Sequence, residues 1–146
     1  MITEDYVSFE IAKLLKEKGF DEECISVYHD EELQLVSSLG IFCGDGVHGE
    51  QILTYSNWSS MLISAPTIQM AMKWLREVHN LFVEIQYATS LLSQPHTTIY
   101  FQIYYMSLDY TTSGKNMLPD DYIREYYTSY EEACEAAIKY CLENLI

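Results

Sequence analysis

The residues best suited to chemistry in this 146-residue chain lie in one glycine-rich stretch, residues 40–50. Asp45, His48 and Glu50 carry the carboxylate and imidazole groups that ligate divalent metals. Their spacing matches no metal motif, and Gly44-Asp45-Gly46 is equally typical of a turn. We therefore expect a loop or an irregular hairpin here, keep the three residues as candidate ligands, and assign no metal or other cofactor. A small metal-dependent enzyme that uses this loop is the alternative function.

The other histidines give no second catalytic pattern. His29 and His96 are expected in loops beside no evident nucleophile. His79 ends a predicted helix, where an imidazole can satisfy a terminal carbonyl. The chain also lacks a P-loop, a Ser-His-Asp pattern, a kinase set, a dinucleotide-binding fingerprint and a zinc signature. These absences favour a protein that is not an enzyme.

The cysteines are widely spaced and form no Cys-x-x-Cys motif. Disulfide frameworks usually occur in shorter secreted chains, so we expect reduced and mostly buried thiols. These residues are Cys24, Cys43, Cys134 and Cys141.

Charge is the least ordinary property of the sequence. The net charge is −14, and residues 1–32 hold ten acids against three lysines, while residues 120–146 hold seven acids against two bases. Such a chain repels nucleic acid and anionic lipid, so direct binding to either is disfavoured. The acidic clusters are either solvated surface or a docking face for a basic protein partner. The residues of this predicted face are Asp21, Glu22, Glu23, Asp30, Glu31, Glu32, Asp120, Asp121, Glu131, Glu132 and Glu135.

Aromatic residues suggest a second kind of interaction. The chain has thirteen tyrosines, and Tyr100, Tyr104 and Tyr110 would suit contacts with a protein, where tyrosine is enriched. A homo-oligomer joined through tyrosine-rich strand faces is therefore a further alternative. Trp58 and Trp74 could form a binding platform with the tyrosines of residues 100–105, but a position in the core or covering a sheet is the better interpretation.

Length and hydropathy favour one domain over residues 1–146. No apolar run approaches the roughly 18–20 residues that cross a membrane, and the start of the chain shows no secretory signal. The cytoplasm is the expected location.

The elements that position these residues centre on a helix that starts near Pro66 and ends at Asn80. Ile68, Ala71, Met72, Leu75 and Val78 form its apolar stripe. The period then changes from helical to alternating over residues 81–87, and residues 98–106 are rich in β-branched and aromatic side chains, so the two segments are predicted to pair antiparallel.

The two ends of the chain predict two more helices. Residues 6–18 form the first, with Ser8 as a candidate N-cap and Gly19 after its end. The last begins after Ser129, which forms a capping box with Glu132. Shorter strands are expected between the helices, and residues 33–39 fit a strand or a helical turn. We predict an α+β domain in which an antiparallel sheet of four to six strands carries about three helices mainly on one face.

Two segments carry a resemblance. Residues 63–67 with Ala71 and residues 73–80, together with residues 130–133 and 135–138, resemble recurrent segments in small proteins of gut bacteroidete genomes and their phages. The resemblance covers about a third of the chain. It implies a phage or mobile-element setting and assigns no catalytic residue.

Overall fold

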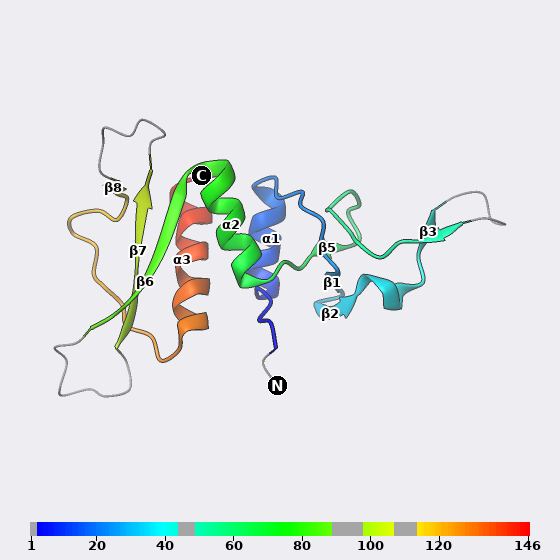
Figure 1. Cartoon of the computed structure of the whole chain (residues 1–146), viewed down its shortest axis with the longest axis horizontal. Coiled ribbons are helices and arrows are strands. Elements are labelled where there is room, and N and C mark those ends of the chain that lie inside the picture. Colours follow the sequence, from blue (N-terminus) through cyan, green and yellow to red (C-terminus); the bar gives the residue numbers. More distant parts are fainter. Residues whose placement is uncertain (1–2, 44–48, 89–97, 107–113) are drawn as a thin grey trace. The chain divides into compact units, whose positions relative to one another are not determined.

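The computed structural model describes residues 3–43, 49–88, 98–106 and 114–146 (Figure 1). The chain divides into two compact units, an N-terminal unit of residues 1–67 and a C-terminal unit of residues 68–146. Helices and antiparallel sheets within these units confirm the α+β class. The single domain over residues 1–146 stays a prediction.

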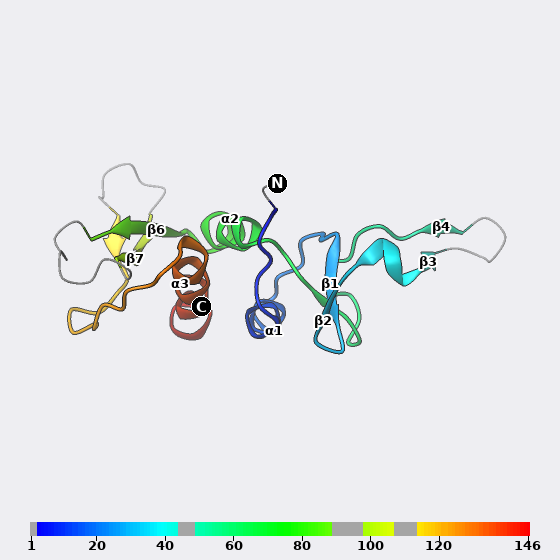
Figure 2. The same cartoon turned by 90° about the horizontal axis from the view of Figure 1, so that it is seen from below.

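The C-terminal unit has the element order α2 (Ile68–His79), β6 (Leu81–Tyr87), β7 (Ile99–Tyr105), β8 (Lys115–Asn116) and α3 (Tyr130–Asn144). The predicted antiparallel pair is confirmed, because β6 and β7 pair over their full length. Figure 2 shows α2 and α3 on the same side of these two strands, and both helices pack against them. Ile99, Phe101 and Ile103 are buried on β7, which gives the unit its core.

The buried side of α2 differs from the predicted stripe. Trp74 is buried with Ile68, Ala71 and Leu75, whereas Val78 is 53% exposed. Trp74 supplies the largest apolar side chain of the helix, while Val78 lies in its last turn. Asn80 ends the helix with φ 56°, as predicted.

The sequence predicts that the His79 imidazole satisfies a carbonyl at the end of the helix. Its Nε2 atom makes no such hydrogen bond with the residues that the structure describes. The imidazole lies 4.5 Å from the Trp74 ring in a T-shaped arrangement. Its Nε2 atom is buried without a hydrogen-bond partner, and burial lowers the pKa of His79. The imidazole therefore packs beside the indole, where burial disfavours its charged form.

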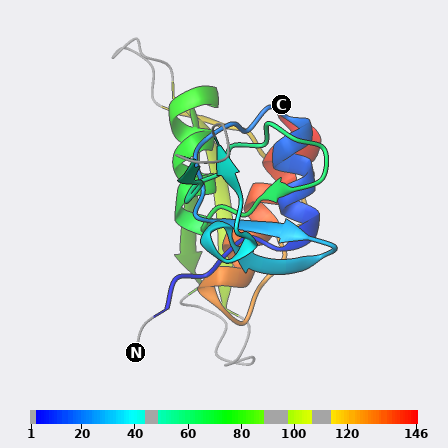
Figure 3. The same ribbon diagram turned by 90° about the vertical axis from the view of Figure 1, so that its right-hand side faces the viewer.

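The N-terminal unit contains α1 (Phe9–Glu17), β1 (Ser26–His29), β2 (Glu32–Leu35), β3 (Phe42–Cys43), β4 (Glu50–Gln51) and β5 (Ile63–Ser64). One sheet has the order β2-β1-β5, and its first two strands form a tight hairpin (Figure 3, blue). The hairpin turn is Asp30-Glu31, whose φ angles of 49° and 66° are both positive. Two positive φ angles are the signature of a type I′ turn, which matches the twist of the strands.

The sequence predicts more than one structure for two segments of this unit, residues 33–39 and residues 40–50. Residues 33–39 contain both predicted forms, since β2 passes directly into a short 3-10 helix over Val36–Leu39. At the two ends of the glycine-rich stretch, β3 pairs antiparallel with β4. Asp45 and His48 lie outside the described residues.

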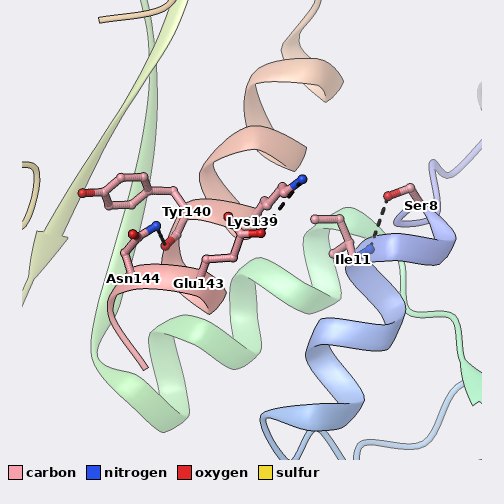
Figure 4. Close-up of polar contacts among 6 residues, drawn as sticks. All are labelled: Ser8, Ile11, Lys139, Tyr140, Glu143 and Asn144. Carbon is pink, nitrogen blue, oxygen red and sulfur yellow. Dashed lines mark hydrogen bonds and ion pairs between the residues drawn. The ribbon is translucent and has the colours of Figure 1, made fainter. Parts of the chain in front are cut away.

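Hydrogen bonds and backbone angles at the helix ends agree with the residues found there. The Ser8 hydroxyl accepts a hydrogen bond from the Ile11 N–H at 3.4 Å, and Gly19 has a positive φ after the helix. Near the end of α3, the Asn144 amide donates to the Tyr140 carbonyl at 3.1 Å (Figure 4). The predicted first helix is thus confirmed, with shorter bounds.

The predicted sheet of four to six strands is wrong for the described residues, which form sheets of three, two and three strands. Most strands of the N-terminal unit end after two to four residues. The chain leaves the extended conformation at Val36 and again at Asn57, whose φ is 57°. In the described part of the chain, no helix is long and apolar enough to cross a membrane.

Candidate functional site

The loop between Tyr55 and Ser64 is held in shape by hydrogen bonds from the side chains of Tyr55, Lys16 and Asn57. Tyr55 is buried, and its hydroxyl accepts a hydrogen bond from the Ser59 N–H at 3.0 Å. The same hydroxyl lies 2.9 Å from the Ser59 carbonyl and 3.0 Å from the Leu62 carbonyl. One side chain therefore satisfies backbone groups across the width of the loop.

Lys16 fixes the same loop from α1. Its ammonium group donates to the carbonyl of Ser59 at 2.6 Å and to that of Leu62 at 2.8 Å. Burial lowers the pKa of Lys16. The lysine thus acts as a tether between the helix and the loop.

Asn57 supplies the third fixed point. Its amide donates to the Phe20 carbonyl at 2.8 Å, and its side-chain oxygen accepts from the Ser64 N–H at 2.8 Å. Asparagine tolerates the positive φ at this position better than most residues. These bonds tie both ends of the loop together.

This fixed loop exposes two large apolar side chains. Trp58 is 60% exposed and Met61 is 77% exposed, so Trp58 does not lie in the core, one of the two positions predicted for it. The Trp58 ring packs at 5.1 Å against Tyr55, which leaves much of the indole in solvent. Aromatic residues and methionine are enriched in protein interfaces. The loop is therefore a preorganised candidate for contact with another molecule.

Two open cavities meet at Met61. The first has a volume of about 330 Å³ and a mostly apolar lining. It is lined by His29, Leu39, Ile41, Trp58, Ser59, Met61 and Leu62. An apolar side chain of a partner would fit this environment.

The second cavity has a volume of about 450 Å³ and combines rings with carboxylates. It is lined by Phe9, Tyr28, Asp30, Glu31, Ser60, Met61 and Ile63. The rings of Phe9 and Tyr28 lie 5.4 Å apart at 71°. The Tyr28 hydroxyl donates to the Val7 carbonyl at 2.7 Å, which holds the ring in place.

The eleven acidic residues of the predicted face lie in four separate segments, two in each unit. Residues 21–23 and 30–32 stand before and after β1. Residues 120–121 follow β8, and residues 131–135 belong to the first turns of α3. Asp30 and Glu31 line the second of the two cavities described above.

Glu132 has a structural partner. Its carboxylate accepts hydrogen bonds from the Thr128 hydroxyl at 2.7 Å and the Thr128 N–H at 3.2 Å. These bonds, the hydroxyl first, lower the pKa of Glu132. The Ser129 hydroxyl in turn accepts from the Glu132 N–H at 3.1 Å. The predicted cap is confirmed, and Glu132 reaches one residue further back than the usual capping box.

Nothing in the described residues assembles a metal centre. Glu50 is exposed on β4. Among the residues that the structure describes, no group of three or more histidine, cysteine or acidic side chains is placed to hold a metal ion. Asp45 and His48 are not part of that description.

The cysteines offer no reactive thiol in the core. All four are free, and three are buried while Cys43 is exposed. Burial raises the pKa of Cys24 and Cys141 to about 12 and that of Cys134 to about 11. Because the thiolate is the nucleophile, these three side chains are poor candidates for covalent chemistry.

No family model, curated protein or solved structure matches the chain.

Sequence reasoning found part of this site and missed the rest. It selected Asp30 and Glu31 from the charge map. It missed the loop residues because Lys16, Tyr55 and Asn57 act through bonds to distant backbone. One usable signal was the short polar stretch around Trp58, with Ser56 and Asn57 before it and Ser59 and Ser60 after it, which is typical of a loop.

Proposed function

We propose that this protein is a non-enzymatic, cytoplasmic binding protein that docks a basic protein partner on its N-terminal unit. The proposal rests on the exposure of Trp58 and Met61 from a loop whose backbone is fixed by side-chain hydrogen bonds. A preformed loop loses little conformational freedom on binding, so more of its contact energy contributes to affinity. Tryptophan is also the residue type most often found at interface hot spots.

Charge supports a basic partner. Residues 1–67 hold twelve acidic residues and three lysines, a net charge of −9. Asp30 and Glu31 line the second cavity, and Met61 of the loop lines the same cavity. Long-range attraction would speed the encounter, and the apolar side chains would then supply contact. If the resemblance to phage proteins reflects origin, a nucleic-acid-handling protein is a suitable basic partner, with the acidic surface standing in for phosphates.

Capture from host lysate with matched variants tests this proposal. Trp58→Ala and Met61→Ala should each remove the captured partner. Ile123→Ala is the matched control, because Ile123 is 85% exposed in the C-terminal unit and belongs to neither cavity. Capture by the unmodified protein should weaken between about 50 and 500 mM salt, since charge attraction is screened. A partner retained by both loop variants would contradict the proposal.

The alternative within the same class is a homo-oligomer joined through the C-terminal unit. Phe82 and Tyr104 lie opposite each other on β6 and β7, and together with Met106 and Gly114 they line a cavity of about 440 Å³. Light scattering of the pure protein separates the alternatives. A mass above one chain that survives high salt and is lost in Phe82→Ser would favour the oligomer.

A further inference from the structure

The cavity beside the β1–β2 turn has the chemistry of a cation site. Phe9 and Tyr28 present aromatic rings, and Asp30 and Glu31 present carboxylates at the same opening. The face of an aromatic ring attracts a cation, and carboxylates pair with one. An anionic ligand would be repelled here. A purely apolar ligand would fail to use the acidic edge.

A cation of the chain itself already lies near one of these rings. The Lys13 ammonium is 5.6 Å from the centre of the Phe9 ring. The other basic group nearby is His29, whose Nε2 atom is 3.9 Å from a carboxylate oxygen of Asp30. Phe9 is thus placed where it can face a positive charge.

The turn geometry supports the same conclusion. Asp30 and Glu31 are the two central residues of a type I′ hairpin turn, so their backbone is fixed by the pairing of β1 and β2. Their carboxylates are exposed at the edge of the cavity. A partner's cation can therefore reach both without a rearrangement of the strands.

We propose that this cavity receives one arginine side chain of the basic partner, with its guanidinium against Phe9 and Tyr28 and its N–H groups directed to Asp30 and Glu31. The inference rests on the proposed function and names its recognition element. Arginine fits better than lysine because its planar guanidinium stacks on rings, donates to two oxygens at once and is less strongly hydrated. Met61, which lines both cavities, places an apolar pocket next to this arginine. The partner should thus present arginine beside a large apolar residue.

Titration with short blocked peptides tests the assignment. The probes are Ala-Arg-Ala, Ala-Lys-Ala and Ala-citrulline-Ala, where citrulline has nearly the shape of arginine without its charge. Binding is followed by NMR through the ring protons of Phe9 and Tyr28. The arginine peptide should shift these signals and bind at least about tenfold more tightly than the citrulline peptide, the effect of one lost charge-assisted contact. The lysine peptide should fall between them. Equal responses to arginine and citrulline would overturn the inference.

Paired variants locate the site. Asp30→Asn with Glu31→Gln removes both charges with little change in shape, and asparagine tolerates a positive φ. Glu22→Gln with Glu23→Gln removes the same charge before β1 and serves as the control. Only the first pair should abolish the response to Ala-Arg-Ala, while both retain a folded amide spectrum. A response weakened equally by both pairs would reduce the effect to net charge and overturn the assignment.

The two proposals fail in different ways. If Ala-Arg-Ala gives no response while Trp58→Ala still removes the captured partner, the arginine assignment is wrong and the proposed function stands. If the loop variants also leave the partner in place, both are wrong.

Discussion

The two units of this chain obtain their structure by different means. The C-terminal unit is built from long elements, in which seven residue pairs join β6 to β7 and two helices of 12 and 15 residues pack on that pair. In the N-terminal unit the named strands have two to four residues, and a loop is held by side chains that bond to its backbone. Long, regular helices and strands thus form the C-terminal unit. In the N-terminal unit, hydrogen bonds from individual side chains determine the conformation of the loop. Exposed loops fixed by individual residues are the usual carriers of recognition.

Charge follows the same division. The N-terminal unit carries a net −9, and the C-terminal unit, with ten acids and five bases, carries −5. The more acidic unit is also the one with an exposed tryptophan on a fixed loop. The comparison therefore predicts that variants in the C-terminal core reduce stability, whereas variants in the loop reduce binding first.

The largest expected effect lies in the C-terminal core. Leu75 is fully buried on α2, so Leu75→Ala should lower the free energy of unfolding by about 2–5 kcal/mol. Lys73 is the control, because its ammonium forms only an exposed ion pair with Glu77 at 3.9 Å, and Lys73→Ala should change stability by less than about 0.5 kcal/mol. Denaturant midpoints measure both. Equal midpoints would show that the buried side of α2 is assigned wrongly.

A smaller effect is expected from the loop scaffold. Tyr55→Phe removes a buried hydroxyl that serves Ser59 and Leu62, and an unsatisfied buried group costs about 1–3 kcal/mol. The same change should free Trp58, seen as a loss of its fluorescence anisotropy. Tyr87→Phe, at an exposed tyrosine of β6, is the control. If Tyr55→Phe leaves the mobility of Trp58 unchanged, the scaffold does not fix the loop.

The same contrast between the two units explains which parts of the fold could be predicted from the sequence. The helices, the β6–β7 pair and the Ser129 cap were predicted because each leaves a pattern within ten or so residues. Residues 33–39 stayed ambiguous because residues 33–35 are strand and residues 36–39 are 3-10 helix. The large single sheet was wrong because local pattern does not say where a strand stops pairing.

The site was less predictable than the fold. Lys16 bonds to carbonyls 43 and 46 residues away, a relation that no local spacing reveals. The charge map located Asp30 and Glu31, yet it also selected Glu132, which caps α3. Composition thus identified acidic segments without separating the carboxylates proposed to bind a partner from the structural ones.

The contribution of the Glu132 carboxylate to stability should depend on pH. The Thr128 hydroxyl and N–H hold the pKa of Glu132 below its ordinary value of 4.5. A carboxyl with a lowered folded pKa contributes stability above its unfolded pKa, and this contribution is lost as the pH falls through the folded pKa. Glu132→Gln should therefore lower the melting temperature at neutral pH and have a smaller effect below pH 4.5. Glu131→Gln is the neighbouring control, and an equal response in both variants would contradict the capping role.

The smallest effect is expected from divalent metals. Magnesium, manganese and zinc should leave the melting temperature unchanged, because a ligand stabilises a protein only when it binds the folded state more tightly than the unfolded one. Glu50 is exposed in a two-residue strand, and the described residues assemble no group of metal-binding side chains around it. A shift that persists in His48→Ala would reflect metal bound elsewhere. A shift that is lost in His48→Ala would instead show that the glycine-rich stretch binds metal, and it would favour the enzyme over the binding protein.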